Sequence, residues 1–289
     1  MDRTLQKRKC LQAKAKNDAV AAFELARSFG FEHPRSFRQE VDWYRRAAEM
    51  GNVEAQNLLG ECYRDGHGVG RNLKLGIKLL LLAAKRGEPN AQVSIGYQLF
   101  YGEHIKRDRP KAIYWYRKAA AQGQVRALSN LGLSYQFGKG VKKNYRESLK
   151  WFRKAAAQNH ARSLFWIGHS YWWARGMRTN LRRAFEWFWK AAWFGDAEAN
   201  TYVGMCFHDG VGVRKNLKRA LKHYRLAAKE DSYAQYCLGL CYRDGEGVKQ
   251  SRQLAFCWLK KSAANGEPDA IKTLKEFAKR NAFAKKNHC

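Results

Sequence analysis

Cysteine is the residue type that first invites a chemical interpretation of this 289-residue chain. Cys62, Cys206 and Cys241 recur at equivalent places, and Cys237 lies near the last of them. Structural zinc sites take such thiols in C-x-x-C pairs or with closely spaced histidines, and the sequence contains neither arrangement. We therefore interpret the cysteines as buried thiols that behave like small hydrophobic side chains, and we expect neither a metal nor a cofactor.

The glycine-rich motifs and the acidic residues give no catalytic set either. The motif at residues 66–69 lacks the Lys-Ser/Thr that follows the glycines of a phosphate-binding loop, and similar motifs recur along the chain as turns would. Glu61, Asp65 and Asp209 fall near the expected ends of helices, where water solvates them. No nucleophile, acid–base pair or metal set is evident, so the sequence predicts a protein that is not an enzyme.

Charge is the property that points most directly to a partner. Lys and Arg total 55 and Asp and Glu total 25, which gives a formal net charge of +30. A compact chain with this charge repels itself, and an acidic partner would relieve the repulsion and be steered towards the chain. The 45% of hydrophobic residues suffice for a folded core. Because no apolar run is long enough to span a membrane and no secretory signal pattern is present, we expect a cytoplasmic protein without membrane contact.

An internal repeat must position any of these side chains. A glycine that follows Leu, Ile or Val recurs at 60, 96, 132, 168, 204 and 239, so successive copies are 36, 36, 36, 36 and 35 residues apart. A small residue stands five positions before each glycine, from Ala55 to Ala234, and in four copies a Trp stands nineteen positions after it. This periodicity predicts a tandem array of one supersecondary unit.

Each copy divides into two amphipathic helices. In the third copy Ala127, Leu131 and Tyr135 recur every four residues and form one face of the first helix. Residues 138–141 contain the glycines of a turn, and Asn144 is suited to cap the start of the second helix. Neither helix can bury its apolar face alone, so neighbouring hairpins must stack. We therefore predict an all-α solenoid of stacked helix hairpins.

The segment boundaries follow from the alignment of the copies. Six full copies are expected at residues 52–87, 88–123, 124–159, 160–195, 196–230 and 231–266. A basic N-terminal segment at 1–16 and a degenerate capping repeat at 17–51 precede them, and a capping helix with a basic tail at 267–289 follows.

The repeated residues resemble the Sel1-like repeat, a relative of the tetratricopeptide repeat. The family pattern A-x-x-x-L-G-x-x-Y-x-x-G-x-G-V is followed by a helix with W-[YF]-x-K-A-A, and the resemblance covers roughly residues 17–275. It implies a right-handed α/α superhelix whose first helices line the concave side, and a scaffold or adaptor rather than an enzyme. Members of the family serve as signalling adaptors, host-interaction factors and immunity proteins that bind bacterial toxins, so the resemblance leaves the partner open. The third copy has nearly all of the pattern, in Ala127, Leu131, Gly132, Tyr135, Gly138, Gly140, Val141, Trp151, Phe152, Lys154, Ala155 and Ala156.

Aromatic residues of the middle copies form the first candidate binding surface. In a solenoid of helix hairpins, the concave positions lie six and three residues before the glycine of the first helix and one, four and five residues after it. Copies one and five have mainly polar residues there, whereas copies two to four have aromatic ones, and exposed apolar clusters mark binding sites. Packing between neighbouring copies is the alternative explanation. The candidate residues are Tyr97, Phe100, Tyr101, Phe137, Phe165, His169, Trp172 and Trp173.

Basic residues between the turn and the second helix form the second candidate surface. They occupy the same place in successive copies, so stacking would align them. Cations just before a helix N-terminus oppose the helix dipole, so local stability does not explain their presence. We interpret them as a basic rim that consists of Lys106, Arg107, Lys142, Lys143, Arg178, Arg214 and Lys215.

Two functions from different classes fit these surfaces. In the first, the chain is a monomeric scaffold that binds an acidic protein (a toxin, an effector or a signalling protein), with the aromatic residues as anchors and the basic rim for steering. In the second, the chain binds RNA or single-stranded nucleic acid, because cations neutralise phosphates and exposed aromatic rings stack on bases. The sequence has no nucleic-acid recognition motif, so we favour the protein partner.

Overall fold

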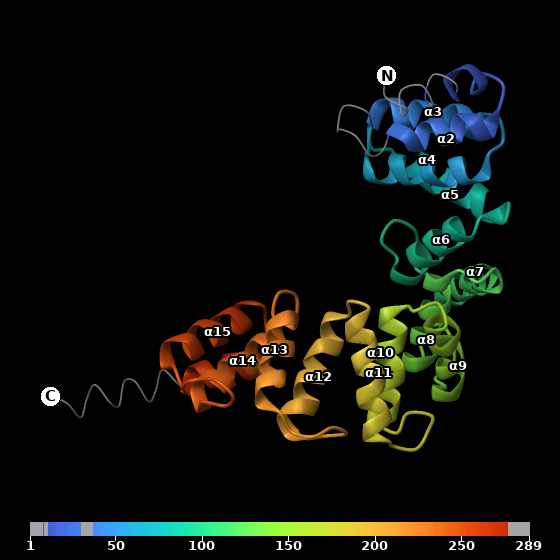
Figure 1. Cartoon of the computed structure of the whole chain (residues 1–289). Helices are drawn as coiled ribbons and strands as arrows, with labels where there is room; N and C mark the ends of the chain where they lie inside the picture. The colour runs from blue at the N-terminus through green and yellow to red at the C-terminus, as the bar shows by residue number, and fades with distance from the viewer. Residues whose placement is uncertain (1–7, 9–10, 30–36, 277–289) are drawn as a thin grey trace. The chain divides into compact units, whose positions relative to one another are not determined.

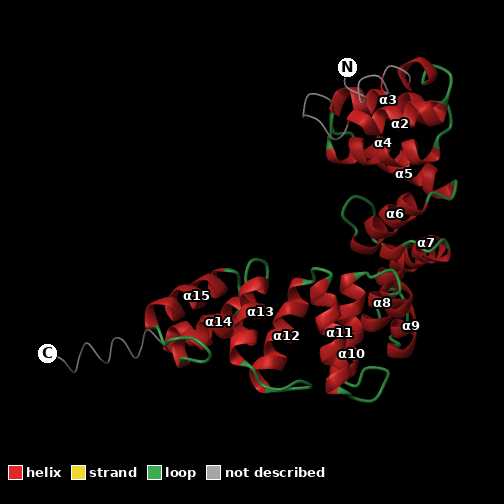
Figure 2. Cartoon of the chain, in the orientation of Figure 1, coloured by secondary structure: helices red, strands yellow, loops and turns green. Residues whose placement is uncertain are grey.

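Helices are the only regular elements in the part of the chain that the computed structural model describes, which comprises residues 8, 11–29 and 37–276 (Figure 1, Figure 2). The chain divides into two compact units, unit 1 at residues 1–143 and unit 2 at residues 144–289. None of the described helices is both long and apolar enough to cross a membrane.

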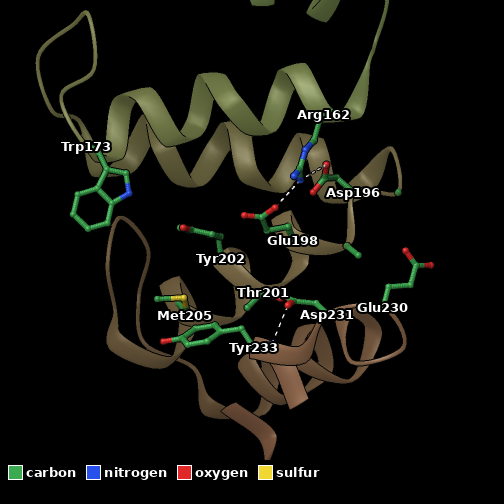
Figure 3. A pocket seen from close by; sticks show the side chains of 12 residues that line it. Arg162, Trp173, Asp196, Glu198, Thr201, Tyr202, Met205, Glu230, Asp231 and Tyr233 are labelled. Carbon is green, nitrogen blue, oxygen red and sulfur yellow. Dashed lines mark hydrogen bonds and ion pairs between the residues drawn. The ribbon is translucent and has the colours of Figure 1, made fainter. Parts of the chain in front are cut away.

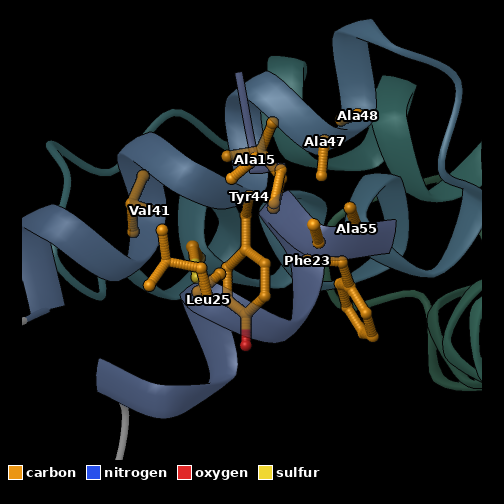
Figure 4. Packing of buried hydrophobic residues seen from close by; sticks show 13 residues of the cluster. Ala15, Phe23, Leu25, Val41, Tyr44, Ala47, Ala48 and Ala55 are labelled. Atoms are coloured by element: carbon orange, nitrogen blue, oxygen red, sulfur yellow. The ribbon is translucent and has the colours of Figure 1, made fainter. Parts of the chain in front are cut away.

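Unit 1 consists of helix hairpins that follow one another in chain order. Its helices are α2 (Ala19–Phe29), α3 (Phe37–Glu49), α4 (Val53–Asp65), α5 (Leu73–Lys85), α6 (Pro89–Tyr101), α7 (Arg109–Ala121) and α8 (Val125–Phe137). Within hairpins α2 packs on α3, α4 on α5 and α6 on α7, and neighbouring hairpins meet where α3 contacts α4, α5 contacts α6 and α7 contacts α8. In the first hairpins Phe23, Leu25 and Tyr44 pack with alanines such as Ala47 and Ala55 to form a hydrophobic cluster (Figure 4).

Unit 2 repeats the same arrangement. Its helices are α9 (Tyr145–Ala156), α10 (Ala161–Trp172), α11 (Leu181–Trp193), α12 (Ala197–Asp209), α13 (Leu217–Ala227), α14 (Ser232–Asp244) and α15 (Arg252–Ala264). The hairpins are α10 with α11, α12 with α13 and α14 with α15, and contacts of α9 with α10, α11 with α12 and α13 with α14 join them into a stack. Each first helix therefore packs between its own second helix and the second helix of the preceding copy.

The repeat glycine lets the two helices of a hairpin approach closely. A Cβ atom added at Gly96 would lie 2.5 Å from the ring of Tyr116, and one at Gly204 would lie 2.5 Å from the ring of Tyr224. Both tyrosine rings are buried. Any side chain at these positions would have to displace a close-packed ring, so the periodic glycine is a requirement of helix packing.

The turn and the helix start are built as the sequence predicts. Gly138 ends α8 with a φ of 68°, and its N–H donates to the carbonyl of Ser134. Asn144 Oδ1 accepts hydrogen bonds from the backbone N–H groups of Arg146 and Glu147 at the start of α9. These contacts satisfy backbone groups that a helix end leaves without an intrahelical partner.

Buried glutamines tie neighbouring hairpins together, a contact that the sequence did not suggest. Gln56 Nε2 donates to the carbonyl of Ala48 at 3.2 Å, and Gln92 Nε2 donates to the carbonyl of Ala84 at 3.1 Å. Gln235 makes the corresponding bond in unit 2. The acceptor carbonyls stand at the end of the preceding helix, so each glutamine side chain links the first helix of its copy to the copy before it.

The predicted all-α architecture of stacked helix hairpins is confirmed. The degenerate repeat predicted at 17–51 contains the hairpin of α2 and α3, and residues 268–276 of the predicted capping helix are helical. Residues 1–7 and 9–10 of the predicted basic N-terminal segment, and residues 277–289 of the predicted basic tail, lie outside the described residues.

Candidate functional site

A hollow in unit 2 opens between the first helices of its hairpins. It has a volume of about 720 Å³ and is lined by α12, by Arg162 of α10 and by residues around the start of α14. Aromatic side chains stand on one side of it, where Trp173, Tyr202 and Tyr233 lie near Met205 (Figure 3). The acidic residues Asp196, Glu198, Glu230 and Asp231 stand on the other side (Figure 3).

Charged side chains along this hollow pair with one another. Arg162 Nη1 lies 2.7 Å from Glu198 Oε2 and 3.5 Å from Asp196 Oδ2. Thr201 Oγ1 donates a hydrogen bond to Asp231. The lining contains four carboxylates and one guanidinium, so the hollow is acidic although the chain as a whole is basic.

Two of the four aromatic candidates in unit 2 belong to the core. Phe165 is 0% exposed, and its ring lies between Phe188, at a centroid distance of 5.6 Å, and Tyr202, at 5.4 Å. His169 is 9% exposed. Burial, together with the charge of Arg175, lowers the pKa of His169 to about 4. The expectation that these two side chains face solvent is wrong, because the neighbouring copy covers them.

The two tryptophans after His169 differ from each other. Trp172 is half-buried and its ring lies 6.0 Å from that of Phe188 and 6.0 Å from that of Tyr202. Trp173 is 56% exposed and lines the hollow. Of the four predicted residues, Trp173 is therefore the one that offers an open ring face at the hollow.

The aromatic candidates of unit 1 are mostly at the surface. Tyr97, Tyr101 and Phe137 are 41%, 56% and 48% exposed, and the rings of Tyr97 and Tyr101 lie 4.5 Å apart. Phe100 is the exception: it is 8% exposed and packs near Tyr116 at 6.2 Å. Phe100 therefore leaves the candidate surface and joins the core.

Unit 1 has its own, smaller hollow on the first helices. It has a volume of about 140 Å³ and its lining includes Glu54, Asn57, Glu61, Ser94 and Arg126. Ser94 Oγ donates to Glu61 Oε1 at 3.1 Å, and burial raises the pKa of Glu61 although Arg64 opposes the shift. Part of the polar lining is thus already engaged in hydrogen bonds between neighbouring copies.

The basic rim residues are all exposed, at equivalent places just before the second helix of each hairpin. At the second of these places the stem of the side chain packs against the glycine that ends the first helix, which leaves little room for any other residue at the glycine position. The Cβ of Arg107 would lie 2.9 Å from a Cβ on Gly102, and the Cβ of Lys215 would lie 3.3 Å from one on Gly210. The stem covers the glycine turn and leaves the charged end in water. Unit 1 holds Lys106, Arg107, Lys142 and Lys143, and unit 2 holds Arg178, Arg214 and Lys215.

The three cysteines that recur at equivalent places are buried as the sequence suggests, whereas Cys237 is half-buried and Cys257 is exposed. Cys62, Cys206 and Cys241 are buried free thiols. Burial raises the pKa of Cys62 and Cys206 to about 12 and that of Cys241 to about 11, with smaller contributions from nearby acidic groups. A thiol that stays protonated is a poor nucleophile and a poor metal ligand.

One group in unit 2 has the residue types of a metal site. Ligand atoms of His208, Cys241 and Glu246 lie within 4.8 Å of one another. Both ring nitrogens of His208 already have partners, because Nδ1 lies 2.6 Å from Asp209 Oδ1 and Nε2 lies 2.7 Å from Glu246 Oε2. Burial lowers the pKa of His208, but the two carboxylates outweigh it and the net pKa is raised. These hydrogen bonds join His208 to Asp209 and Glu246, and the ligand atom of Cys241 lies beside them.

The sequence did not lead us to expect residues of the fifth and sixth copies in the hollow. Glu198 and Met205 occupy concave positions of the fifth copy, which the sequence analysis excludes from the candidate surface because its concave residues are mainly polar. Tyr233 stands six residues before Gly239, which is also a concave position, and that spacing could have found it. Tyr202 stands two residues before Gly204, which is not one of the expected concave positions, yet its long side chain lines the hollow.

A family model described as Sel1 repeat matches the chain seven times, at residues 19–52, 53–88, 89–124, 125–160, 161–192, 197–232 and 232–267. The first match includes the copy that the sequence analysis treats as a degenerate cap, and the other six correspond to the predicted copies. A comparison with curated proteins gave no match.

Solved structures with the same fold include two Sel1 repeat proteins. A protective antigen present in uropathogenic Escherichia coli strains is 30% identical, with a TM-score of 0.79 over 91% of this chain, which spans 57% of that protein. A Sel1 repeat protein from Oxalobacter formigenes is 29% identical, with a TM-score of 0.77 over 85% of this chain and 96% of that one. An immunity protein from Pseudomonas aeruginosa is 20% identical, with a TM-score of 0.51 over 73% of this chain and 80% of that one, a likeness of fold alone.

Proposed function

Because the chain belongs to the Sel1 repeat family, we propose that it is a scaffold without enzymatic activity that binds an acidic protein partner. Sel1 repeats indicate a scaffold for protein–protein interaction. The finer part of the proposal concerns the partner: a protein with an acidic surface, for which a toxin, an effector or a signalling protein would each qualify. The scaffold binds this partner as a monomer.

Exposed aromatic rings on the first helices carry this proposal. Tyr97, Tyr101 and Phe137 in unit 1, and Trp173 in unit 2, are each between 41% and 56% exposed. Large rings of this kind supply most of the energy in many interfaces, because they bury much area at low entropic cost. The exposed basic rim supports an acidic partner, since complementary charge speeds encounter and fixes orientation.

Nucleic acid is the alternative that the hollow of unit 2 disfavours. Trp173 and Tyr202 would be the rings on which bases stack, yet Glu198, Glu230 and two aspartates line the same hollow. These carboxylates would repel the phosphates that must accompany a stacked base. A protein surface can place uncharged or cationic groups there and acidic groups on the rim, so a protein partner fits both features.

The test is capture of a partner on the immobilised full chain, with nuclease-treated lysate, followed by binding kinetics with the purified partner. We expect a one-to-one complex with an acidic protein. Reversing the rim charge with Lys142→Glu and Lys143→Glu should lower the association rate about tenfold and change the dissociation rate less. Replacing Trp173 with Ala should instead raise the dissociation rate, because an anchor is lost.

The matched control reverses two exposed charges, with Lys222→Glu on the second helix α13 and Lys229→Glu in the turn after it. This variant has the same net charge as the rim variant, so a specific rim effect must exceed it. Equal slowing by both variants would reduce the rim to a general charge effect. A partner lost on nuclease treatment, or unaffected by both the rim and the Trp173 changes, would refute the proposal.

A further inference from the structure

We propose that the hollow of unit 2 receives a cationic side chain, an arginine or a lysine, from the bound partner. This inference rests on the proposed function and deepens it, because it specifies what an otherwise acidic partner presents to one place on the scaffold. It arises from the combination of acidic and aromatic residues around one open volume.

The size and the lining of the hollow suit a long cation. Its volume of about 720 Å³ exceeds that of a single side chain, so an arginine with part of its backbone can enter. The rings of Trp173, Tyr202 and Tyr233 border it on one side (Figure 3). Cations bind to the faces of aromatic rings, and they bind more tightly where water is excluded.

Two of the four carboxylates are exposed at the hollow, although one of them is already paired with Arg162. Asp196 Oδ1 caps α12 by accepting the N–H of Ala199 at 2.8 Å, and Asp231 Oδ1 accepts the N–H of Tyr233 at 3.0 Å at the start of α14. These two aspartates contribute to the negative potential of the hollow, but one oxygen of each already accepts a backbone hydrogen bond at a helix start. Glu230 is exposed and can turn towards an incoming cation, and the side chain of Glu198 is 42% exposed, so a cation can reach it beside its Arg162 partner.

The chain already contains one guanidinium held in this manner. Arg162 Nη1 lies 2.7 Å from Glu198 Oε2, while its guanidinium carbon lies 5.0 Å from the ring centroid of Phe165 and 5.9 Å from that of Trp166. The hollow brings the same two kinds of group, the carboxylates of Glu198 and Glu230 and the ring of Trp173, to the border of one open volume. The single internal arginine leaves the lining with an excess of negative charge.

General surface charge does not explain such a hollow. With a formal net charge of +30, the chain as a whole repels cations. Carboxylates and aromatic rings that are concentrated at one site therefore attract a cation locally, although the positive charge of the whole chain repels it at longer range. An acidic partner with one protruding basic side chain would satisfy the basic rim and the hollow at once, and this pairing would fix its register.

The experiment uses the full chain and a fluorescein-labelled peptide of twelve residues, in which glutamates flank one central position. That position is arginine, lysine or citrulline, and citrulline matches arginine in shape but carries no charge. Fluorescence anisotropy at low salt gives each affinity. We expect the arginine or the lysine peptide to bind at least about fivefold tighter than the citrulline peptide, and the tighter of the two identifies the cation.

Variants of the hollow should abolish this preference for a cation. Glu198→Gln and Trp173→Leu each remove one recognition element at an exposed site, and circular dichroism with the unfolding midpoint verifies their folding. Glu186→Gln, at an exposed carboxylate on α11 outside the hollow, is the matched control and should keep the preference.

The outcomes separate this inference from the proposed function. Equal affinity for all three peptides overturns the inference and leaves the acidic-partner proposal intact. A preference for the cation that survives both Glu198→Gln and Trp173→Leu also overturns it, because the cation then binds elsewhere. Failure of every peptide to bind at low salt counts against the proposed function, and the inference falls with it.

Discussion

The two hollows are built from the same repeat positions and have opposite character. In unit 1 the position six residues before the repeat glycine holds Glu54, Asn90 and Arg126, and the hollow is a polar space of about 140 Å³. In unit 2 that position holds Arg162, Glu198 and Tyr233, and the hollow is an aromatic and acidic space of about 720 Å³. The repeat thus fixes the backbone position of each concave residue. The neighbouring side chains determine whether that residue is used in a contact between copies or stays accessible to a ligand.

Individual positions show the same lesson. The residue after the repeat glycine is Tyr97 in unit 1, which is 41% exposed, and His169 in unit 2, which is 9% exposed. The residue five places after the glycine is Tyr101 in unit 1 and Trp173 in unit 2, and both are 56% exposed. A side chain five residues after the glycine is therefore not covered by the next copy. A side chain one residue after the glycine becomes buried when the next copy has bulky residues.

The largest expected effect separates core from surface aromatics. Phe165→Ala should destabilise unit 2 by about 3–5 kcal/mol, because it leaves a cavity among buried rings. Trp173→Ala should change the free energy of unfolding by less than about 0.5 kcal/mol, since that side chain packs little. Urea unfolding followed by circular dichroism measures both, and similar costs for the two variants would contradict the division between them.

The pH dependence of stability tests the difference in burial between His169 and the equivalent Tyr97. The folded state lowers the pKa of His169 to about 4, so below an unfolded-state pKa of about 6.5 the unfolded chain binds a proton that the folded chain rejects. Stability from this group is therefore full above pH 6.5 and is lost as the pH falls towards 4, by up to about 3 kcal/mol.

The variant His169→Phe should remove this part of the pH dependence, because phenylalanine keeps a ring but has no proton to bind. Urea midpoints at pH 7.5, 5.5 and 4.5 for both proteins provide the measurement. The interpretation fails if the two proteins lose stability in parallel over this range. Tyr97→Phe in unit 1 is the matched control and should leave the pH profile unchanged.

The turn after the first helix allows a reciprocal exchange between the units. Gly138 in unit 1 has a φ of 68°, and Ala174 at the equivalent place in unit 2 has a φ of 53°. A left-handed conformation costs a residue with a Cβ about 1 kcal/mol relative to glycine. Ala174→Gly should therefore raise the melting temperature, and Gly138→Ala should lower it; shifts of the same sign in calorimetry would exclude backbone strain as the cause.

The smallest expected effect concerns a pair at the ends of two first helices. Unit 1 has Arg64 beside Asp65 at 2.7 Å, and unit 2 has His208 beside Asp209 and Glu246. Burial lowers the pKa of His208 but its two carboxylate partners raise it further, so the charged form stabilises the fold at low pH. This contribution is full below pH 6.5 and disappears as the pH rises through the raised value.

Replacing His208 by Gln should therefore destabilise unit 2 more at pH 5.5 than at pH 8, by less than about 1 kcal/mol because the pair is partly exposed. His208→Arg should make unit 2 resemble unit 1 and remove the dependence. Thermal unfolding of the three proteins at both pH values is the measurement, and a larger effect of the Gln change at pH 8 would reverse the assigned sign.

Local chemistry made much of this fold predictable. Gly96 and Gly204 are needed wherever two helices meet closely, and Asn144 caps a helix through its own backbone neighbours. Both constraints act within one copy, so they recur with the period of the sequence. The candidate site was less predictable, because Phe100 and Phe165 had the right spacing for the surface yet are buried. Phe100 packs near Tyr116 of its own copy, and Phe165 lies between Phe188 of its own copy and Tyr202 of the next copy.

The sequence by itself determined the repeat length, the helix hairpin, the turns and the excess of positive charge, since each depends on residue type and on neighbours a few positions away. Only the tertiary structure decided that Trp173 remains open while Phe165 is sealed, and that Glu198 and Tyr233 from later copies join one acidic hollow. Burial and local electrostatic field are sums over side chains from several copies. A periodic pattern specifies their positions but not the volumes and charges that meet there.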